Sequence, residues 1–155
     1  MNSKTLYIYI PIFLITLFFS YILKFDISNG GSSRDLYYHW NYIEALRDDI
    51  SILLEYNHSY KRTFSQHYPL HHIIISRFDF LSMSQENYLN FYFLFSLILP
   101  ILFFICLNNR FPEIDIKKKI FISSLIYFLP NFQASAIWGN SHISSLIFFL
   151  LSIFF

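Results

Sequence analysis

Four apolar blocks set the strongest limit on how this chain can fold. About 20 consecutive apolar residues in a helix cross the hydrocarbon core of a bilayer. A long polar segment, 24–87, separates the first block from the other three. We predict an all-α membrane protein in which 1–155 is a single membrane domain with about four transmembrane helices, at 5–23, 88–107, 120–130 and 137–155.

The composition supports a membrane protein. Charged residues make up 14% of the 155 residues, whereas soluble domains carry about 25%. The net charge of +1 gives no reason to expect a nucleic-acid partner. Cys106 is the one cysteine and lies in an apolar run, so the sequence excludes an intramolecular disulfide.

The two terminal blocks raise separate questions. Lys4 precedes the first block, as in a signal peptide. That block is rich in bulky side chains and has no small-residue cleavage site after Leu23, so we expect an uncleaved helix. The last block is still apolar at Phe155, where a spanning helix normally has an interfacial anchor. We expect the chain to be the N-terminal part of a longer protein whose C-terminal part is missing.

Basic residues are unevenly divided between the connecting segments. The connection 108–119 contains Arg110 and three consecutive lysines, whereas the basic residues of 24–87 are spread out among acids. Cytoplasmic loops carry the excess of Lys and Arg. We therefore predict an inner or plasma membrane protein with a cytoplasmic N-terminus and with 24–87 on the outer side.

The outward segment has two stretches of helical character. After the turn signal at 29–33, apolar residues recur at helical spacing, at Leu36, Trp40, Ile43, Ile50 and Leu54. Pro69 then precedes an apolar run, 70–81, that is too short to span. We predict two amphipathic helices that lie in the membrane interface.

Asp35 is the first candidate for chemistry. It lies near a predicted helix start, and His39 is one turn further along the same face. A carboxylate in that position can take a proton from an attacking hydroxyl. The alternative is a carboxylate that only stabilises the helix N-terminus.

Histidines form the second candidate. His67, His71 and His72 lie within six residues. A metal site would need a further ligand, but no Glu completes a His-Glu-x-x-His motif and Pro69 interrupts the helix. We predict neither a metal nor a cofactor, and expect these histidines to contact head groups or a substrate phosphate.

Two other groups of polar residues have alternative interpretations. Residues 138–142, Trp-Gly-Asn-Ser-His, are either interfacial anchors or functional groups that face a cavity. Arg34, Lys61 and Arg62 either bind a lipid phosphate or are solvated loop charges.

The order of these features resembles the N-terminal part of the GT-C glycosyltransferases, close to the protein mannosyltransferases. Residues 33–40, SRDLYYHW, stand where that superfamily has an acid in its first outward loop. Residues 67–72, HYPLHH, are similar to its His-Pro-Pro-Leu patch. Leu129-Pro130 followed by 136–142, AIWGNSH, is similar to its turn between the third and fourth spans.

The resemblance implies a cell-envelope transferase that uses a polyprenyl-phosphate-linked sugar. It implies that Asp35 is the catalytic base for an inverting transfer. A cation would steady the leaving phosphate. We expect substrate binding by Arg34, His39, Arg62, His67, His71 and His142. Because most spans of a lipid groove would be missing, we expect the isolated chain to be inactive.

Two alternatives from other classes stay open. One is a small non-catalytic membrane subunit that packs against a larger partner. The other is a fragment of a polysaccharide polymerase, ligase or flippase, since these proteins share a multi-span architecture.

Overall fold

The chain folds into helices. The computed structural model describes residues 3–23, 32–53 and 69–154, and these contain no strand, which confirms the predicted all-α class. In chain order the elements are α1 Ser3–Leu23, α2 Ser32–Asp48, η2 Ile50–Leu53, α3 Leu70–Ser76, α4 Asp79–Ser82, α5 Gln85–Ser96, α6 Ile98–Arg110, α7 Ile116–Ser124, η4 Leu125–Phe128, α8 Pro130–Ile137 and α9 His142–Phe154.

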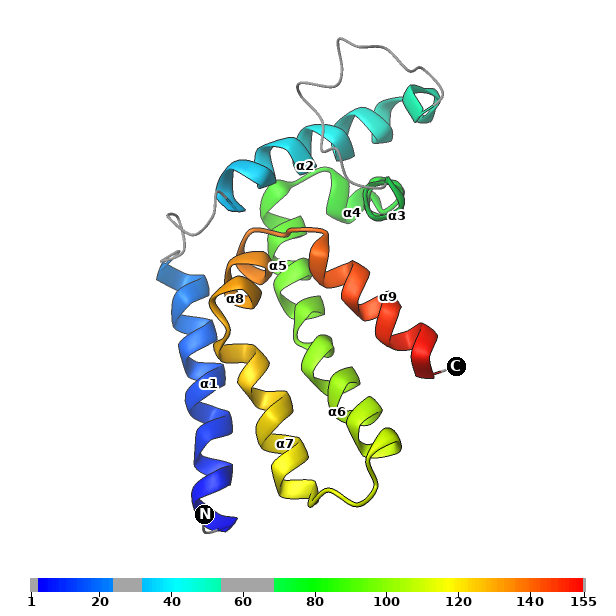
Figure 1. The fold of residues 1–155 in the computed structure, drawn as a ribbon. Coiled ribbons are helices and arrows are strands. Elements are labelled where there is room, and N and C mark those ends of the chain that lie inside the picture. Colours follow the sequence, from blue (N-terminus) through cyan, green and yellow to red (C-terminus); the bar gives the residue numbers. More distant parts are fainter. Residues whose placement is uncertain (1–2, 24–31, 54–68, 155) are drawn as a thin grey trace.

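The helices form a bundle with a cap at one end. In Figure 1, α1, α5–α6 and α7 run along the long direction, and α2 lies across the upper end beside α3 and α4. The start of α1 and the α6–α7 connection lie at the opposite end. Helix α2 packs on α3, α1 on α7 and η4, and α6 on both α7 and α9. The cap and the bundle are therefore connected mainly through α5.

One helix of the described residues is long and apolar enough to cross a membrane. Gln85–Arg110 combines α5 and α6 over 26 residues. Ile116–Phe128 and Pro130–Ile137 would form a second span if their 59° bend lies within one span. The apolar helices Pro11–Leu23 and His142–Phe154 are shorter. The structure thus supports one or two of the four predicted spans by length and composition.

Proline explains two of the helix boundaries. The break at Leu97 lies just before Pro100, which has no N–H to bond the carbonyl four residues earlier. Pro130 begins α8, where its fixed φ suits the first helical turn. The predicted spans end at 130 and begin again at 137, but the structure has α8 between these positions and begins α9 at His142.

The predicted second interfacial helix over 70–81 is divided. Helix α3 ends at Ser76, Phe78 is extended, and α4 begins at Asp79. Arg77 at the break donates a hydrogen bond to the carbonyl of Leu46, near the end of α2. The break therefore places a cation where it bonds a carbonyl of the α2 C-terminal turn.

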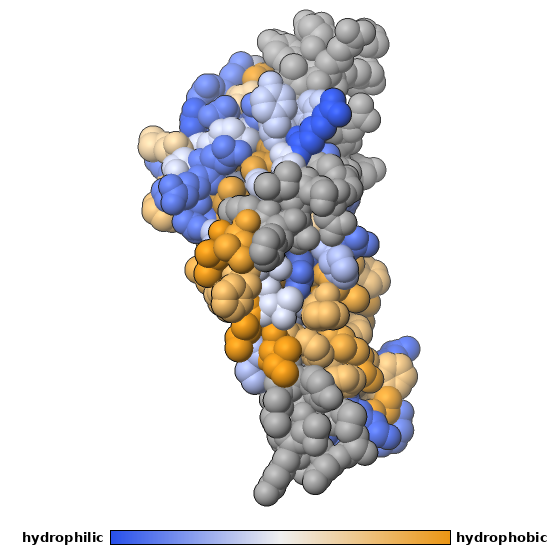
Figure 2. Space-filling view, turned by 90° about the vertical axis from the view of Figure 1, so that its left-hand side faces the viewer, coloured by the Kyte–Doolittle hydropathy of each residue, from blue (hydrophilic) through white to orange (hydrophobic). Residues whose placement is uncertain are grey.

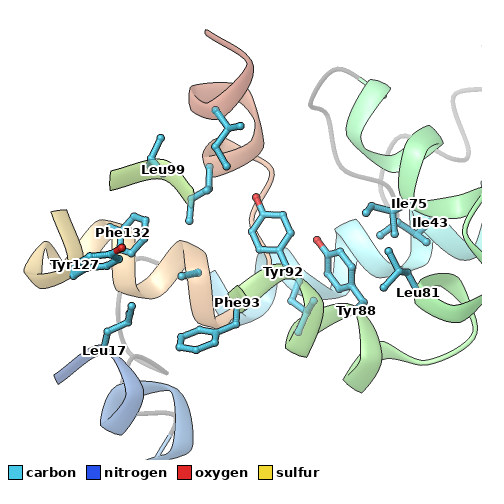
Figure 3. Packing of buried hydrophobic residues seen from close by; sticks show 14 of the residues in the cluster. Leu17, Ile43, Ile75, Leu81, Tyr88, Tyr92, Phe93, Leu99, Tyr127 and Phe132 are labelled. Carbon is cyan, nitrogen blue, oxygen red and sulfur yellow. The ribbon is translucent and has the colours of Figure 1, made fainter. Parts of the chain in front are cut away.

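Hydrophilic and hydrophobic surface residues occupy separate zones along the length of the molecule. Hydrophilic residues gather at the end that carries α2, an apolar belt lies below it, and a small hydrophilic patch lies at the opposite end (Figure 2). The apolar core is continuous through the molecule and includes Leu17 of α1, Ile43 of α2, and Tyr88 and Tyr92 of α5 (Figure 3).

Candidate functional site

A cavity of about 720 Å³ lies between α6, η4, α8 and α9, with α2 at one end. Its apolar walls come from residues of all four bundle elements: Leu99, Phe103, Ile126, Leu129, Phe132, Ala134, Ile143, Leu146, Phe149 and Leu150. Its polar lining comes from Asp35, Asn131, Ser135, Asn140 and His142. The cavity is therefore mostly apolar with a few polar groups, which is the usual make-up of a small-molecule site.

Asp35 brings a carboxylate to this cavity. It is half-buried in the first turn of α2, where the helix dipole favours a negative charge. No ion pair or side-chain hydrogen bond joins it to another described residue. The carboxylate thus lines the cavity without a cation from the described part of the chain to neutralise it.

The turn between α8 and α9 presents Asn140 to the cavity. Gly139 has φ +66°, and a Cβ on it would lie 2.6 Å from Cε1 of Tyr88, so the position requires glycine. Tyr88 donates a hydrogen bond to the carbonyl of Gly139, and Tyr92 donates to that of Asn140. The Asn140 N–H donates to the carbonyl of Ser135 over 3.0 Å. The backbone of the turn is therefore held from two sides.

The Asn140 side chain differs from its backbone in hydrogen bonding. The residue is 3% exposed, yet its Oδ1 has no hydrogen-bond partner among the described residues. A buried polar atom without a partner costs about 1–3 kcal/mol. Unpaired buried groups of this kind call for a specific explanation, such as a ligand.

Tyr88 and Tyr92 also belong to a second set of polar residues, which we call the histidine–tyrosine cluster. Its members are His39, His71, His72, Tyr88, Tyr92 and Ser144. His39 Nδ1 and His72 Nε2 are 2.7 Å apart, and their rings stack at 5.0 Å. Both side chains are buried, so this hydrogen bond is a buried polar contact between α2 and α3.

His71 joins α3 to α5 and α9. Its Nε2 lies 3.1 Å from the Tyr88 hydroxyl, and its Nδ1 lies 3.1 Å from the Ser144 hydroxyl. Burial, and then the nearby His39, lower the pKa of His71 from 6.5 to about 3. His71 is consequently neutral at physiological pH.

The structure separates the predicted site residues into two places. Asp35 and His142 line the cavity together, and Arg34 is exposed on α2 next to Asp35. His39 and His71 belong to the histidine–tyrosine cluster and do not line the cavity. Asp35 and His39 were expected on one helix face, but one lines the cavity and the other is paired with His72. Arg62 and His67 lie outside the described residues.

Sequence reasoning named Asn140 only as part of the 138–142 group, with two alternative interpretations, and did not select Tyr88 or Tyr92. The two tyrosines lie four apart inside an apolar block, so helical periodicity places them on one face. That spacing indicates that both hydroxyls can bond the same neighbouring segment, as they do in the turn between α8 and α9. For Asn140 the signal was its position among the polar residues 138–142 at the boundary of an apolar block.

Within residues 3–23, 32–53 and 69–154, no three His, Cys, Asp or Glu side chains are grouped as a metal would require. Comparisons with known proteins add no relative: no family model, no curated protein and no solved structure matches this chain. The candidate function therefore rests on the cavity itself and on the resemblance in the order of motifs.

Proposed function

We propose that this chain is the N-terminal module of a membrane glycosyltransferase that transfers a sugar from a polyprenyl-phosphate donor to an acceptor hydroxyl on the outer side. The observation that carries the proposal is the position of Asp35, whose carboxylate lines a cavity with apolar walls. A carboxylate that lines an apolar cavity can take the proton of a hydroxyl group while the rest of that molecule stays in the apolar part of the cavity.

Membrane insertion is the first part of the proposal, and three features support it. Only 28% of the most apolar 18-residue stretch of Gln85–Arg110 is buried. Most of this apolar helix is therefore exposed, unlike the core helix of a soluble protein. An apolar belt lies between two hydrophilic ends (Figure 2). The lysine-bearing start of α7 lies at the end opposite α2 (Figure 1), which favours a cytoplasmic position for that end.

The chemistry follows from the carboxylate. The acceptor oxygen attacks the anomeric carbon of the sugar while its proton passes to a carboxylate oxygen of Asp35. The bond between that carbon and the phosphate oxygen breaks, and its electron pair leaves with the polyprenyl phosphate. The exposed guanidinium of Arg34, adjacent in sequence, is a described cation able to steady this leaving group.

The test is sugar transfer by membranes from cells that express the full-length protein. Label from polyprenyl-phosphate mannose or glucose is followed into lipid and protein fractions. Asp35→Asn is expected to lower transfer at least about 100-fold, because general-base catalysis contributes about 10²–10⁴-fold. Asp48→Asn is the matched control, since Asp48 is an exposed acid on the same helix.

Two results would contradict the proposal. Unchanged transfer by Asp35→Asn would remove the base assignment. No transfer by the unmodified protein from any polyprenyl-phosphate donor would favour a non-catalytic subunit.

A further inference from the structure

We infer that the cavity binds a neutral amphipathic lipid through a hydroxyl group, which Asp35 and Asn140 hydrogen-bond while the alkyl chain lies along α6 and α9. Within the proposed function this lipid is the acceptor, and the phosphate-bearing donor binds elsewhere. That last point rests on the proposed function, whereas the binding itself does not.

The charge of the lining favours a neutral head group. Of the described residues that line the cavity, Asp35 carries a negative charge and none is a lysine or an arginine. A phosphate placed there would meet a like charge in a largely apolar environment, where repulsion is poorly screened. A hydroxyl avoids this cost and keeps the hydrogen bonds.

The hydrogen-bonding needs of the two side chains also fit a hydroxyl. An ionised Asp35 only accepts hydrogen bonds, so its partner must donate. Asn140 has both an acceptor and donors on its amide, and a hydroxyl can serve either of them. The Oδ1 of Asn140 lacks a partner among the described residues, and Asn140 lines the cavity, so a ligand hydroxyl that reaches the amide would supply the hydrogen bond.

The tertiary structure holds Asn140 in place independently of any ligand. Tyr92 and Ser135 bond its carbonyl and its N–H, and Gly139 before it allows the turn. The backbone that carries the amide is therefore held in advance, and binding needs no rearrangement of this turn. From this position the cavity continues along α9 past Leu146 to Phe149.

Binding is measured on the purified full chain in nanodiscs of uncharged phospholipid. The probes are a long-chain alcohol with a diazirine on its alkyl chain and the matched alkyl phosphate. Crosslinked residues are identified by mass spectrometry, and affinity is obtained by competition with the unlabelled compound. We expect the alcohol to label α6 or α9 residues of the cavity and to bind at least about tenfold more tightly than the phosphate.

Two variants separate binding from folding. Asn140→Leu is expected to weaken binding of the alcohol about three- to tenfold, without loss of stability, because the replaced amide oxygen has no partner. Gln133→Leu is the matched control: Gln133 is also buried, but its amide accepts from Ser20 and donates to the carbonyl of Tyr127. This control should lower the unfolding temperature and leave affinity within about twofold.

A third variant tests the alkyl site. Leu146 is 50% exposed and lines the cavity, so Leu146→Trp can add volume without overpacking the core. It should abolish labelling of Phe149 and its neighbours.

The inference is overturned if the alkyl phosphate binds as tightly as the alcohol, or if Asn140→Leu loses stability but not affinity. Either result leaves the sugar-transfer test of Asp35 untouched. Conversely, alcohol binding that depends on Asn140 would stand even if no sugar transfer is found.

Discussion

The histidine–tyrosine cluster and the cavity contain similar residue types but use them in opposite ways. In the cluster, hydrogen bonds join His39 to His72, and His71 to both Tyr88 and Ser144. In the cavity, Asp35 has no described ion pair, and Asn140 Oδ1 has no described hydrogen-bond partner. One region uses its polar groups to join helices, and the other has polar residues that line a cavity.

The difference shows why residue type alone is a poor guide to a site. Histidines are frequent in functional sites, and four of them were candidates here. Of these, His71 has both ring nitrogens engaged inside the protein, and His39 has its Nδ1 bonded to His72. Asn140 is a less conspicuous residue, but it lines the cavity and its Oδ1 has no hydrogen-bond partner among the described residues.

The largest expected effect concerns the turn that connects the two regions. Gly139→Ala should destabilise the fold by about 3 kcal/mol, because alanine is disfavoured at φ +66° and its Cβ would overlap Tyr88. Thermal unfolding in detergent measures this change. Ser145→Ala, at an exposed position nearby, should change stability by less than about 1 kcal/mol. A tolerated Gly139→Ala would show that the turn is not fixed by the tyrosines.

An intermediate effect concerns acid. The folded pKa of His71 is about 3, below its ordinary 6.5, so the unfolded chain binds the proton more readily as pH falls. The contribution of neutral His71 to the free energy of unfolding is fully present above pH 6.5. It decreases as the pH falls below 6.5, by up to about 2 kcal/mol at pH 5. Unfolding at pH 7 and pH 5 measures this loss. His71→Gln should reduce the pH dependence, whereas the same change at the exposed His142 should retain it.

The smallest effect concerns the Tyr92 hydroxyl, which donates to the Asn140 carbonyl and accepts from the Ser144 N–H. Tyr92→Phe removes the donor to the Asn140 carbonyl and should cost about 1 kcal/mol in stability. Because that bond also positions Asn140, binding of the long-chain alcohol should weaken about two- to threefold. Tyr37→Phe, on a side chain that is 58% exposed, is the control for both measurements. Equal effects of the two variants would argue against a positioning role for Tyr92.

The sequence predicted the helical class and much of the element order. Bilayer-length apolar blocks gave α1 and the α5–α6 helix, and helical spacing gave α2. Local chemistry explains this success, since proline and apolar periodicity act within a few residues of where they stand. The division of 70–81 into α3 and α4 was missed, because it coincides with Arg77 bonding a carbonyl of α2, which is remote in sequence.

The candidate site was only partly visible in the sequence. Asp35 and His142 were both selected, but nothing along the chain indicated that they line one cavity. His39 was expected to work with Asp35 because four residues separate them on a helix. The packing of α3 against α2 instead paired His39 with His72.

By itself, the sequence determined the all-α class, the helices α1, α2 and α5–α6, and the positions where proline interrupts a helix. Only the tertiary structure decided which polar groups are satisfied. Hydrogen-bond satisfaction depends on distances of about 3 Å between groups on different helices. Such distances arise from packing, which is why Asn140 stands out in the structure and not in the sequence.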